Sequence, residues 1–457
     1  MKFLRLITAI TIITCVTTCL FSSPTHPNVL IIVADDMGYG ELTCQGFKTD
    51  IPTPFIDSIA TNGIRFTNAY VSAPYCSPSR AGLLTGRYAT RYGHEFNPGP
   101  AEITAPTIGL PIEEKTIADR LKAAGYISGW FGKSHMGYAP QFHPYKRGFD
   151  EYFGFLGGMH DYLNAEADKN DMILEGTEQI KDLSYTTDSF AQKAANFIQK
   201  NSKSPWLCYL AFNAVHMPLE STTKYLARFP NIKDQKRRTY AAMESAMDDG
   251  VGLVLNKLRE LNLEENTLVI FLSDNGGPTP TTTSSNGPLR GFKSQTWEGG
   301  IRIPFIIQWK NHLTADQIDK RPIIALDILP TVLAASGLEA KPEWKLDGVN
   351  LIPYLTTKTD QAPHEILFWR FGRQIALRKG EWKLVKAPLN GVEALIRGGK
   401  GTTQNAQLYN LDRDIGETTN LASTYPDKVK ELSKIWNQIN QEMVPAKWGH
   451  NSRKADE

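Results

Sequence analysis

The chain has 457 residues, more than one ordinary hydrophobic core needs and enough for two domains. Hydrophobic residues make up 41% and charged residues 21%, as in a typical globular protein. The formal net charge of +2 excludes the strongly basic surface of a nucleic-acid-binding protein, so an anionic ligand must be held by local side chains.

Residues 1–23 have the layout of a secretory signal peptide. Lys2 and Arg5 precede a short apolar run, which small residues follow. The run is short for a membrane span, although an uncleaved anchor is the alternative. The residues before Cys15 and Cys19 fit a lipoprotein cleavage box poorly. We therefore predict a secreted or periplasmic protein without a membrane span after signal cleavage.

The mature chain keeps Cys44, Cys76 and Cys208. This odd, sparse set argues against a disulfide framework. Cys208 lies in PWLCYLAF and is predicted to be a buried strand residue.

Four apolar runs end in polar side chains. The first, third and fourth are continuous and apolar, as buried strands of a parallel sheet are, whereas the second is a weaker strand that follows a good helical segment. The runs are NVLIIVADD, ending in Asp35 and Asp36; YISGWFGKSH, ending in Lys133 and His135; PWLCYLAFNAVH, ending in His216; and NTLVIFLSDNGG, ending in Asp274 and Asn275.

Helical segments lie between these runs: TPFIDSIATNG, TIADRLKAAGY with a capping Thr116, and TYAAMESAMDDGVGLVLNKLRELNL. The alternation predicts an α/β domain with a mixed, largely parallel sheet sandwiched by helices. Sites in such sheets form beyond the carboxyl ends of the strands, where all four polar clusters fall.

The pattern changes after about residue 350. EILFWR, QIALRKG, EWKLVKA and AQLYNL predict a small antiparallel sheet, and DKVKELSKIWNQINQEM predicts a final helix. We divide the mature chain into a catalytic α/β domain over 24–350 and an α+β subdomain over 351–457. TPTTTSSNGPLRG is predicted to be a flexible polar loop.

Asp35, Asp36, Asp274 and Asn275 are hard oxygen donors at neighbouring strand ends. Three carboxylates and an amide oxygen suit Ca²⁺ or Mg²⁺, and the absence of histidine from this set disfavours zinc. Either pair alone could be a helix cap or a turn. Their occurrence at equivalent places favours a metal site.

The cationic and proton-transferring candidates would form a pocket for a tetrahedral oxyanion, with the metal screening its charge. The alternative is a structural role for a lone histidine and a solvated role for a lysine. These candidates are Arg80, Lys133, His135, His216 and Lys293.

Cys76 stands in PYCSPSRAGLLTGR, in turn-forming and polar surroundings. A helix is predicted to start just after the thiol, and its N-terminus favours an anion. Arg80, four residues on, lies on the same helix face. A thiolate nucleophile is possible, but a thiol is a poor calcium ligand, so a harder atom at this position would fit better.

CSPSRAGLLTGR resembles the sulfatase signature, Cys-x-Pro-Ser-Arg followed by Thr-Gly-Arg. In that family the cysteine is oxidised by a maturation enzyme to formylglycine, an aldehyde that hydrates to a gem-diol. The resemblance implies an alkaline-phosphatase-like fold and extends over nearly the whole mature chain. Its other motifs are NVLIIVADDMGYGELTCQG, GWFGKSHMG with Ser134 in place of tryptophan, SDNGG, GFKSQTWEGGIRIPFI and LYNLDRDIGETTNLA.

The resemblance also implies roles for the candidate residues. Formylglycine at position 76 would attack the sulfur of a sulfate ester, and His216 would protonate the leaving alcohol. Lys133 and Lys293 would bind sulfate oxygens, Arg80 would steady the formylglycine, and His135 would take a proton from its remaining hydroxyl. Ca²⁺ would be held by Asp35, Asp36, Asp274, Asn275 and the modified residue 76.

The expected substrate is a sulfated carbohydrate, either a sulfated galactan such as carrageenan or a glycosaminoglycan fragment. RYGHEFNPGP and FGFLGGMHDYLNAE are predicted to line the mouth of the site with Arg91, His94, His160 and Asp161. Two alternatives are a phosphodiesterase or phosphonate hydrolase on the same scaffold, and a non-catalytic glycan-binding relative with an unmodified Cys76.

Overall fold

The computed structural model describes residues 26–47, 49–100, 105–166, 170–357, 359–388 and 401–449. The predicted signal segment, including Cys15 and Cys19, lies outside the described residues. Within those ranges, no helix has both the length and the apolar character that crossing a membrane requires.

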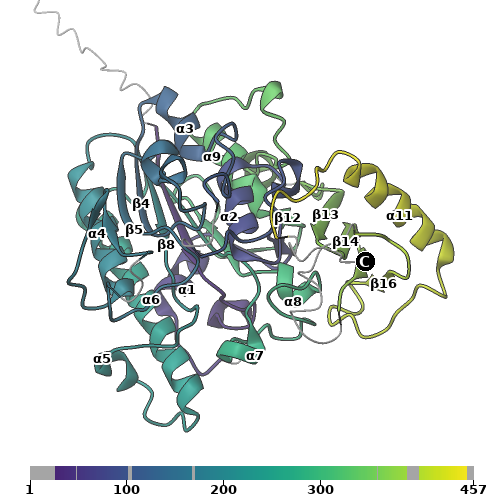
Figure 1. Cartoon of the computed structure of the whole chain (residues 1–457), viewed down its shortest axis with the longest axis horizontal. Helices are drawn as coiled ribbons and strands as arrows, with labels where there is room; N and C mark the ends of the chain where they lie inside the picture. The colour runs from purple at the N-terminus through teal and green to yellow at the C-terminus, as the bar shows by residue number, and fades with distance from the viewer. Residues whose placement is uncertain are drawn as a thin grey trace, which may run out of the picture.

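The main sheet is mixed and has ten strands in the order β11-β2-β10-β9-β1-β8-β4-β5-β6-β7. Its strands β4, β5 and β8 are labelled in Figure 1. The central strands β9, β1, β8, β4 and β5 run parallel, whereas β10 is antiparallel to both its neighbours. The strands are β1 Asn28–Ala34, β2 Ile64–Phe66, β4 Ile127–Lys133, β5 Glu151–Phe155, β6 Leu174–Glu175, β7 Glu178–Gln179, β8 Trp206–Ala211, β9 Thr267–Ser273, β10 Phe305–Gln308 and β11 Gln317–Asp319, with β3 Ala69–Tyr70 and β12 Ile323–Ile324 pairing beside it.

Helices cover both faces of this sheet. The α-helices are α1 Pro54–Thr61, α2 Cys76–Thr85, α3 Ile117–Leu121, α4 Thr186–Lys200, α5 Thr223–Leu226, α6 Gln235–Glu260, α7 Thr279–Thr282, α8 Glu298–Ile301, α9 Ile328–Ala335, α10 Ile352–Thr356 and α11 Pro426–Asn440. The short 3₁₀ helices are Thr43–Gln45, Ala89–Arg91, Lys122–Ala124, Pro140–Phe142, Pro144–Lys146, Ala325–Asp327 and Pro342–Trp344.

Alternate residues of β1 enter two different cores, because successive side chains of a strand point to opposite faces. Leu30 and Ile32 pack with α1, α4 and α6, whereas Val29 and Ile31 pack with α2, α3 and α9. This burial on both faces explains why the strand reads as a continuous apolar run.

A second sheet of four antiparallel strands packs with α11 at the C-terminal side (Figure 1). Its strands are β13 Ile366–Phe371, β14 Gln374–Lys379, β15 Trp382–Lys386 and β16 Gln407–Asn410. Trp369 and Trp436 share a core with the main sheet. Buried Lys383 also joins the two parts, with Nζ 2.8 Å from a carboxylate oxygen of both Glu298 and Glu417.

The register of the central strands places their carboxyl ends at one level. Ala34 pairs with Ser273 of β9, and Val33 and Gly132 both pair with Ala211 of β8. The polar residues that follow these strands therefore meet at one edge.

The predicted fold class is confirmed, and so are the four central strands and the small C-terminal sheet. Cys208 is a fully buried residue of β8, and the described cysteines form no disulfide. The prediction for TPTTTSSNGPLRG is wrong in part. The segment contains α7, and Ser284 and Asn286 are buried because their side chains bond to the backbone of Gly38 and Gly277.

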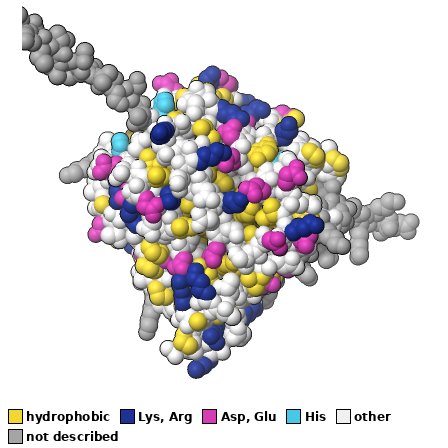
Figure 2. Space-filling model, turned by 90° about the vertical axis from the view of Figure 1, so that its left-hand side faces the viewer, with side chains coloured by type: hydrophobic (Ala, Val, Ile, Leu, Met, Phe, Trp, Pro, Cys, Tyr) yellow, Lys and Arg dark blue, Asp and Glu magenta, His cyan; other side chains and the backbone are white. Residues whose placement is uncertain are grey.

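Charged side chains of both signs are interspersed over the molecular face shown in Figure 2. This agrees with the small net charge and leaves recognition of an anion to the site itself.

Candidate active site

The turn after β1 presents two adjacent carboxylates. Asp36 has a left-handed backbone (φ +64°), which an aspartate tolerates better than most residues. Its N–H donates to Asp274 Oδ1 at 3.1 Å, which ties the ends of β1 and β9 together. Gly38 follows at a close approach, since a Cβ there would lie 2.1 Å from the carbonyl oxygen of Ser285.

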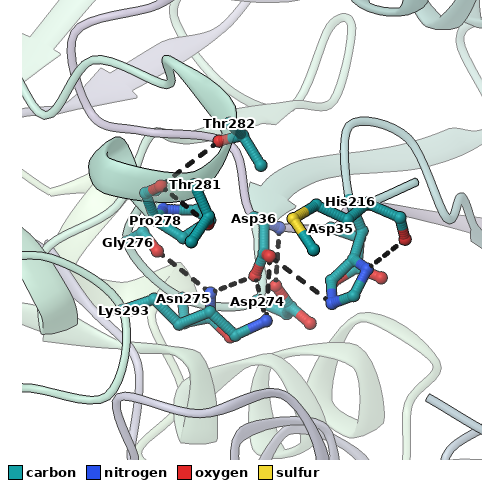
Figure 3. Close-up of polar contacts among 12 residues, drawn as sticks. Asp35, Asp36, His216, Asp274, Asn275, Gly276, Pro278, Thr281, Thr282 and Lys293 are labelled. Atoms are coloured by element: carbon teal, nitrogen blue, oxygen red, sulfur yellow. Dashed lines mark hydrogen bonds and ion pairs between the residues drawn. The ribbon is translucent and has the colours of Figure 1, made fainter. Parts of the chain in front are cut away.

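Cations surround both carboxylates. Lys133 Nζ lies 2.5 Å from Asp35 Oδ2. Lys293 Nζ lies 2.7 Å from Asp36 Oδ1 (Figure 3). Burial alone would raise the pKa of either acid, but the neighbouring cations, led by Lys133 for Asp35 and Lys293 for Asp36, hold each pKa below its usual value. Both aspartates are therefore ionised at neutral pH.

Cys76 is the first residue of α2 and is 1% exposed. Burial raises the pKa of its thiol to about 12, so an unmodified Cys76 would be a neutral thiol at neutral pH. Arg80, one turn on, donates from Nε to Asp274 Oδ2 at 2.8 Å, with NH2 3.6 Å from Asp35 Oδ1.

Asp35, Asp36, Cys76 and His216 bring one potential ligand atom each within 4.8 Å of one another. The buried Oδ1 atoms of Asp35 and Asn275 have no hydrogen-bond partner. Asn275 Nδ2 donates to Asp36 Oδ1 and to the Gly276 carbonyl, which orients the amide oxygen away from both. Among the described residues these two oxygens accept no hydrogen bond, which fits ligands of a hard cation.

Asp274 is placed differently from the other predicted ligands. It lies beside the cluster, but Oδ1 already accepts from Asp36 N and Oδ2 from Arg80 Nε. His216 lies in the cluster instead, with Nε2 3.6 Å from Asp36 Oδ2 (Figure 3).

The two predicted catalytic histidines are oriented by neighbouring backbone. His216 Nδ1 bonds to the Met217 carbonyl at 2.7 Å, which directs Nε2 toward the carboxylates. His135 is 3% exposed, with φ +62° and its N–H bonded to the Leu156 carbonyl. Burial lowers the pKa of both histidines, and a nearby lysine lowers it further: Lys293 for His216 and Lys133 for His135. Both rings are therefore neutral at neutral pH.

Two of the candidates for sugar contacts, His160 and Arg91, are held by contacts within the protein. His160 is nearly buried, bonds through Nδ1 to the Asp161 carbonyl at 2.7 Å and packs on Phe155. Arg91 is engaged by Asp347 and Glu442 in ion pairs of 2.7 and 2.8 Å.

His94 departs from the prediction of a sugar contact. It is fully buried, lies 4.7 Å from Trp448 between ring centroids, and contacts Ser77 Oγ at 2.5 Å. Ser77 Oγ donates to the His135 carbonyl at 2.6 Å. His94 is therefore buried against the start of α2 and exposes no surface for a sugar contact in this structure.

Three further residues position the site and carried no sequence signal. Ser284 Oγ accepts from Gly38 N and bonds to the Asp36 carbonyl. Gln374 of β14 bonds to the backbone of the loop that bears Lys293. Tyr162 Oη donates to the His216 carbonyl at 2.8 Å.

Comparison with known proteins identifies the family of this chain. The family model described as Sulfatase matches residues 27–338. N-acetylgalactosamine-6-sulfatase of Homo sapiens is 31% identical over 93% of this chain and 87% of its own length. Arylsulfatase G of Rattus norvegicus is also 31% identical, over 90% and 85%.

Among solved structures, the protein named Ps i-CgsB superposes with a TM-score of 0.85 at 35% identity, over 94% of this chain and 96% of the other. The same protein has been solved in complex with k-i-k-neocarrahexaose. The resemblance drawn from the motifs is confirmed: the chain belongs to the sulfatase family and is a hydrolase of sulfuric esters.

Proposed function

We propose that this sulfatase removes sulfate from a carbohydrate, using an oxidised residue 76 and a calcium ion. The observation that carries the proposal is the buried Cys76 thiol grouped with Asp35, Asp36 and His216 at the carboxyl ends of the central strands. A neutral thiol is a poor nucleophile and a poor calcium ligand, whereas an oxygen at this position suits both tasks.

Two groups would come from outside the encoded chain. Residue 76, converted by a maturation enzyme to formylglycine, would offer a hydrated aldehyde oxygen as the nucleophile. Asp35, Asp36, Asp274, Asn275 and residue 76 would hold calcium, which would supply positive charge against the sulfate oxygens. The Oδ1 atoms of Asp35 and Asn275, which accept no hydrogen bond from the described residues, support this assignment.

The cationic side chains bind and orient the ester. Three carboxylates face the three cations Arg80, Lys133 and Lys293, so a bound divalent cation would leave the pocket positive. Lys133 and Lys293 would hold sulfate oxygens, and Arg80 would hold the reacting end of residue 76.

Two histidines would move protons. His216 Nε2 is the atom that faces the carboxylates, so it would carry the proton delivered to the leaving sugar oxygen. The negative charge of a bound sulfate ester would raise the pKa of His216 back toward its usual value. His135 is neutral and buried, as a proton acceptor for residue 76 should be.

The names of the relatives favour a galactose-type sugar. One acts on N-acetylgalactosamine 6-sulfate by its name, and another was solved with a carrageenan oligosaccharide. Both ligands contain galactose-configured rings. We therefore place a sulfated galactan first among substrates and a glycosaminoglycan fragment second.

Export is part of the same proposal. The signal pattern over residues 1–23 would direct the chain out of the cytoplasm. Polymeric sulfated glycans are accessible to an exported enzyme.

The test is sulfate release from a panel of sulfated galactan oligosaccharides, glycosaminoglycan fragments and the matching phosphate esters. We expect turnover of at least one sulfated sugar, preference for sulfate over phosphate, and loss of activity in Cys76→Ala. Activity confined to aryl sulfates would contradict the carbohydrate assignment. Preference for phosphate esters would favour a phosphodiesterase instead.

A further inference from the structure

The Ser77 hydroxyl lies between the His94 ring and the backbone carbonyl of His135, and we call these three groups the Ser77 chain. We propose that Ser77 and His94 are positioning residues, which set the place of His135 relative to residue 76 for proton transfer. This inference rests on the proposed function, since it takes His135 as the proton acceptor for residue 76. Both side chains are fully buried, so neither reaches the substrate.

The distances fix the direction of each bond in the Ser77 chain. Ser77 Oγ lies 2.6 Å from the His135 carbonyl oxygen, which can only accept, so the single hydroxyl proton is donated there. Ser77 Oγ also lies 2.5 Å from His94 Nε2, so Nε2 must carry the proton of this second contact. The bonds therefore run in one order, from His94 Nε2–H to Ser77 Oγ–H to the His135 carbonyl.

The surroundings of His94 favour the tautomer that this order requires. Burial, followed by the charge of Lys447, lowers the pKa of His94 to about 3, so the ring is neutral and carries one proton. Nδ1 is buried and has no hydrogen-bond partner among the described residues. A proton on Nδ1 would be a buried donor left unpaired, whereas a proton on Nε2 is donated to Ser77.

The other end of the chain holds a residue with an uncommon backbone conformation. His135 has φ +62°, in the left-handed region that residues other than glycine seldom adopt. Its N–H donates to the Leu156 carbonyl at 2.9 Å, and its carbonyl accepts from Ser77. Gly158 packs on its ring, since a Cβ there would lie 2.5 Å from Cε1. Of these three contacts, Ser77 supplies the one that comes from the helix of Cys76.

The segment that carries His94 also holds the Ser77 backbone. Ser77 N–H donates to Asn97 Oδ1 at 2.9 Å. Trp448 packs against this segment, with its ring 4.7 Å from that of His94 and its Nε1 donating to the Asn97 carbonyl at 3.2 Å. The start of α2 thus rests on a segment that is itself fixed at a second point.

The Ser77 chain should affect the rate of reaction more than the binding of sulfate. Proton transfer needs donor and acceptor within hydrogen-bond reach, and a displacement of about 1 Å can cost about 100-fold in rate. Lys133 and Lys293, the proposed sulfate ligands, are held by their own ion pairs with Asp35 and Asp36.

The experiment is a double-mutant cycle on Ser77→Ala and His94→Leu. Activity is expressed per molecule converted at residue 76, counted by peptide mass spectrometry, because Ser77 adjoins the modified position. On the best substrate of the sulfated-sugar panel, we expect kcat to fall about tenfold in Ser77→Ala and about threefold in His94→Leu. The inhibition constant of inorganic sulfate should stay within about twofold of wild type.

The double variant should be no slower than Ser77→Ala alone, because both residues act through one chain. His94→Gln, whose amide N–H can donate to Ser77 Oγ, should keep kcat near wild type. Multiplicative losses in the double variant would overturn the chain.

Phe96→Leu is the matched control, since it removes a buried ring from the cluster of Trp448 without removing a member of the chain. Its kcat should match wild type even if its Tm falls. A loss of kcat equal to that of His94→Leu would reduce His94 to a packing role and overturn the inference.

The tautomer is tested without turnover, by ¹⁵N-histidine NMR. We expect one histidine, absent from His94→Gln, that is protonated on Nε2 and does not titrate from pH 5 to 9. A proton on Nδ1, or titration near pH 6, would overturn the chain and leave the sulfatase proposal intact. Failure of wild type to cleave any sulfated sugar would overturn the proposed function and, with it, the positioning role, whatever the tautomer.

Discussion

His216 is oriented by one bond, from its Nδ1 to the Met217 carbonyl, so that Nε2 faces the pocket. A sugar alkoxide is a poor leaving group and needs a proton as the bond breaks, whereas nitrophenolate does not. We expect His216→Ala to lower kcat on a sulfated sugar by about 100-fold or more, with a much smaller loss on nitrophenyl sulfate. The ratio of the two losses is the measurement, and equal losses would remove His216 from the proton-donating role.

At the scale of elements, the C-terminal sheet reaches into the site through Gln374 of β14. Its Oε1 accepts from Thr296 N at 3.0 Å, and its Nε2 donates to the Ser294 carbonyl at 2.7 Å. Ser294 N in turn donates to the Pro74 carbonyl at 2.8 Å. One buried side chain therefore fixes the loop of Lys293 against the segment that leads into Cys76.

Gln374→Leu leaves two buried backbone groups without partners, at a cost of about 1–3 kcal/mol each. We expect kcat/KM to fall about tenfold and inhibition by inorganic sulfate to weaken, because Lys293 loses its position. Gln407→Leu, in the same sheet, is the control, because the Gln407 side chain accepts from the Tyr409 hydroxyl and not from the loop of Lys293. The positioning role is refuted if Gln374→Leu lowers thermal stability but leaves sulfate inhibition at the wild-type value.

Helix α6 carries a buried acid that has no hydrogen-bond partner among the described residues. This acid is Glu244: burial, followed by the charge of Glu41, raises its pKa well above the usual value of a glutamate, against the opposing charge of Arg237. The nearby Asp248 and Asp50 act in the same direction as Glu41. The folded state thus retains a proton that the unfolded state releases.

This retained proton contributes to the free energy of unfolding. The contribution is fully present below pH 4.5 and is lost as pH rises through the pKa of Glu244 in the folded state. Glu244→Gln is neutral at every pH, so its Tm relative to wild type should increase from pH 5 to pH 9. Glu260→Gln, whose side chain is 62% exposed, should show no such trend. A constant Tm difference for Glu244→Gln across this range would show that Glu244 is ionised in the folded protein.

The central elements, and the grouping of Asp35, Asp36, Cys76 and His216 at one place, were predictable because both follow from local sequence. The apolar runs of β1, β8 and β9 are buried on both faces, and parallel strands bring their ends together. Ser284 and Gln374 were not predictable, since they contact residues 248 and 80 positions away through ordinary polar side chains. His94 was misplaced because a polar, glycine-bearing segment reads as a surface loop, whereas Trp448 covers this ring.

At the scale of the whole molecule, the proposed metal site lies where β1, β8 and β9 end. Calcium bound at about 100 times its dissociation constant would stabilise the fold by about 2.7 kcal/mol. We expect a calcium-selective chelator to abolish activity and lower Tm by about 3 °C, with recovery of both on adding calcium. Asp35→Asn should lack this response. Stoichiometric zinc without calcium in the purified protein would contradict the oxygen-ligand assignment.

The central claim is that residue 76 acts as an oxidised side chain rather than as a thiol. Peptide mass spectrometry of purified, active enzyme tests it most directly. Conversion of –CH₂SH to –CHO lowers the mass of the peptide containing Cys76 by about 18 Da, and we predict that activity per molecule rises in proportion to the converted fraction. Fully active enzyme in which every molecule keeps an unmodified Cys76 thiol would contradict the account.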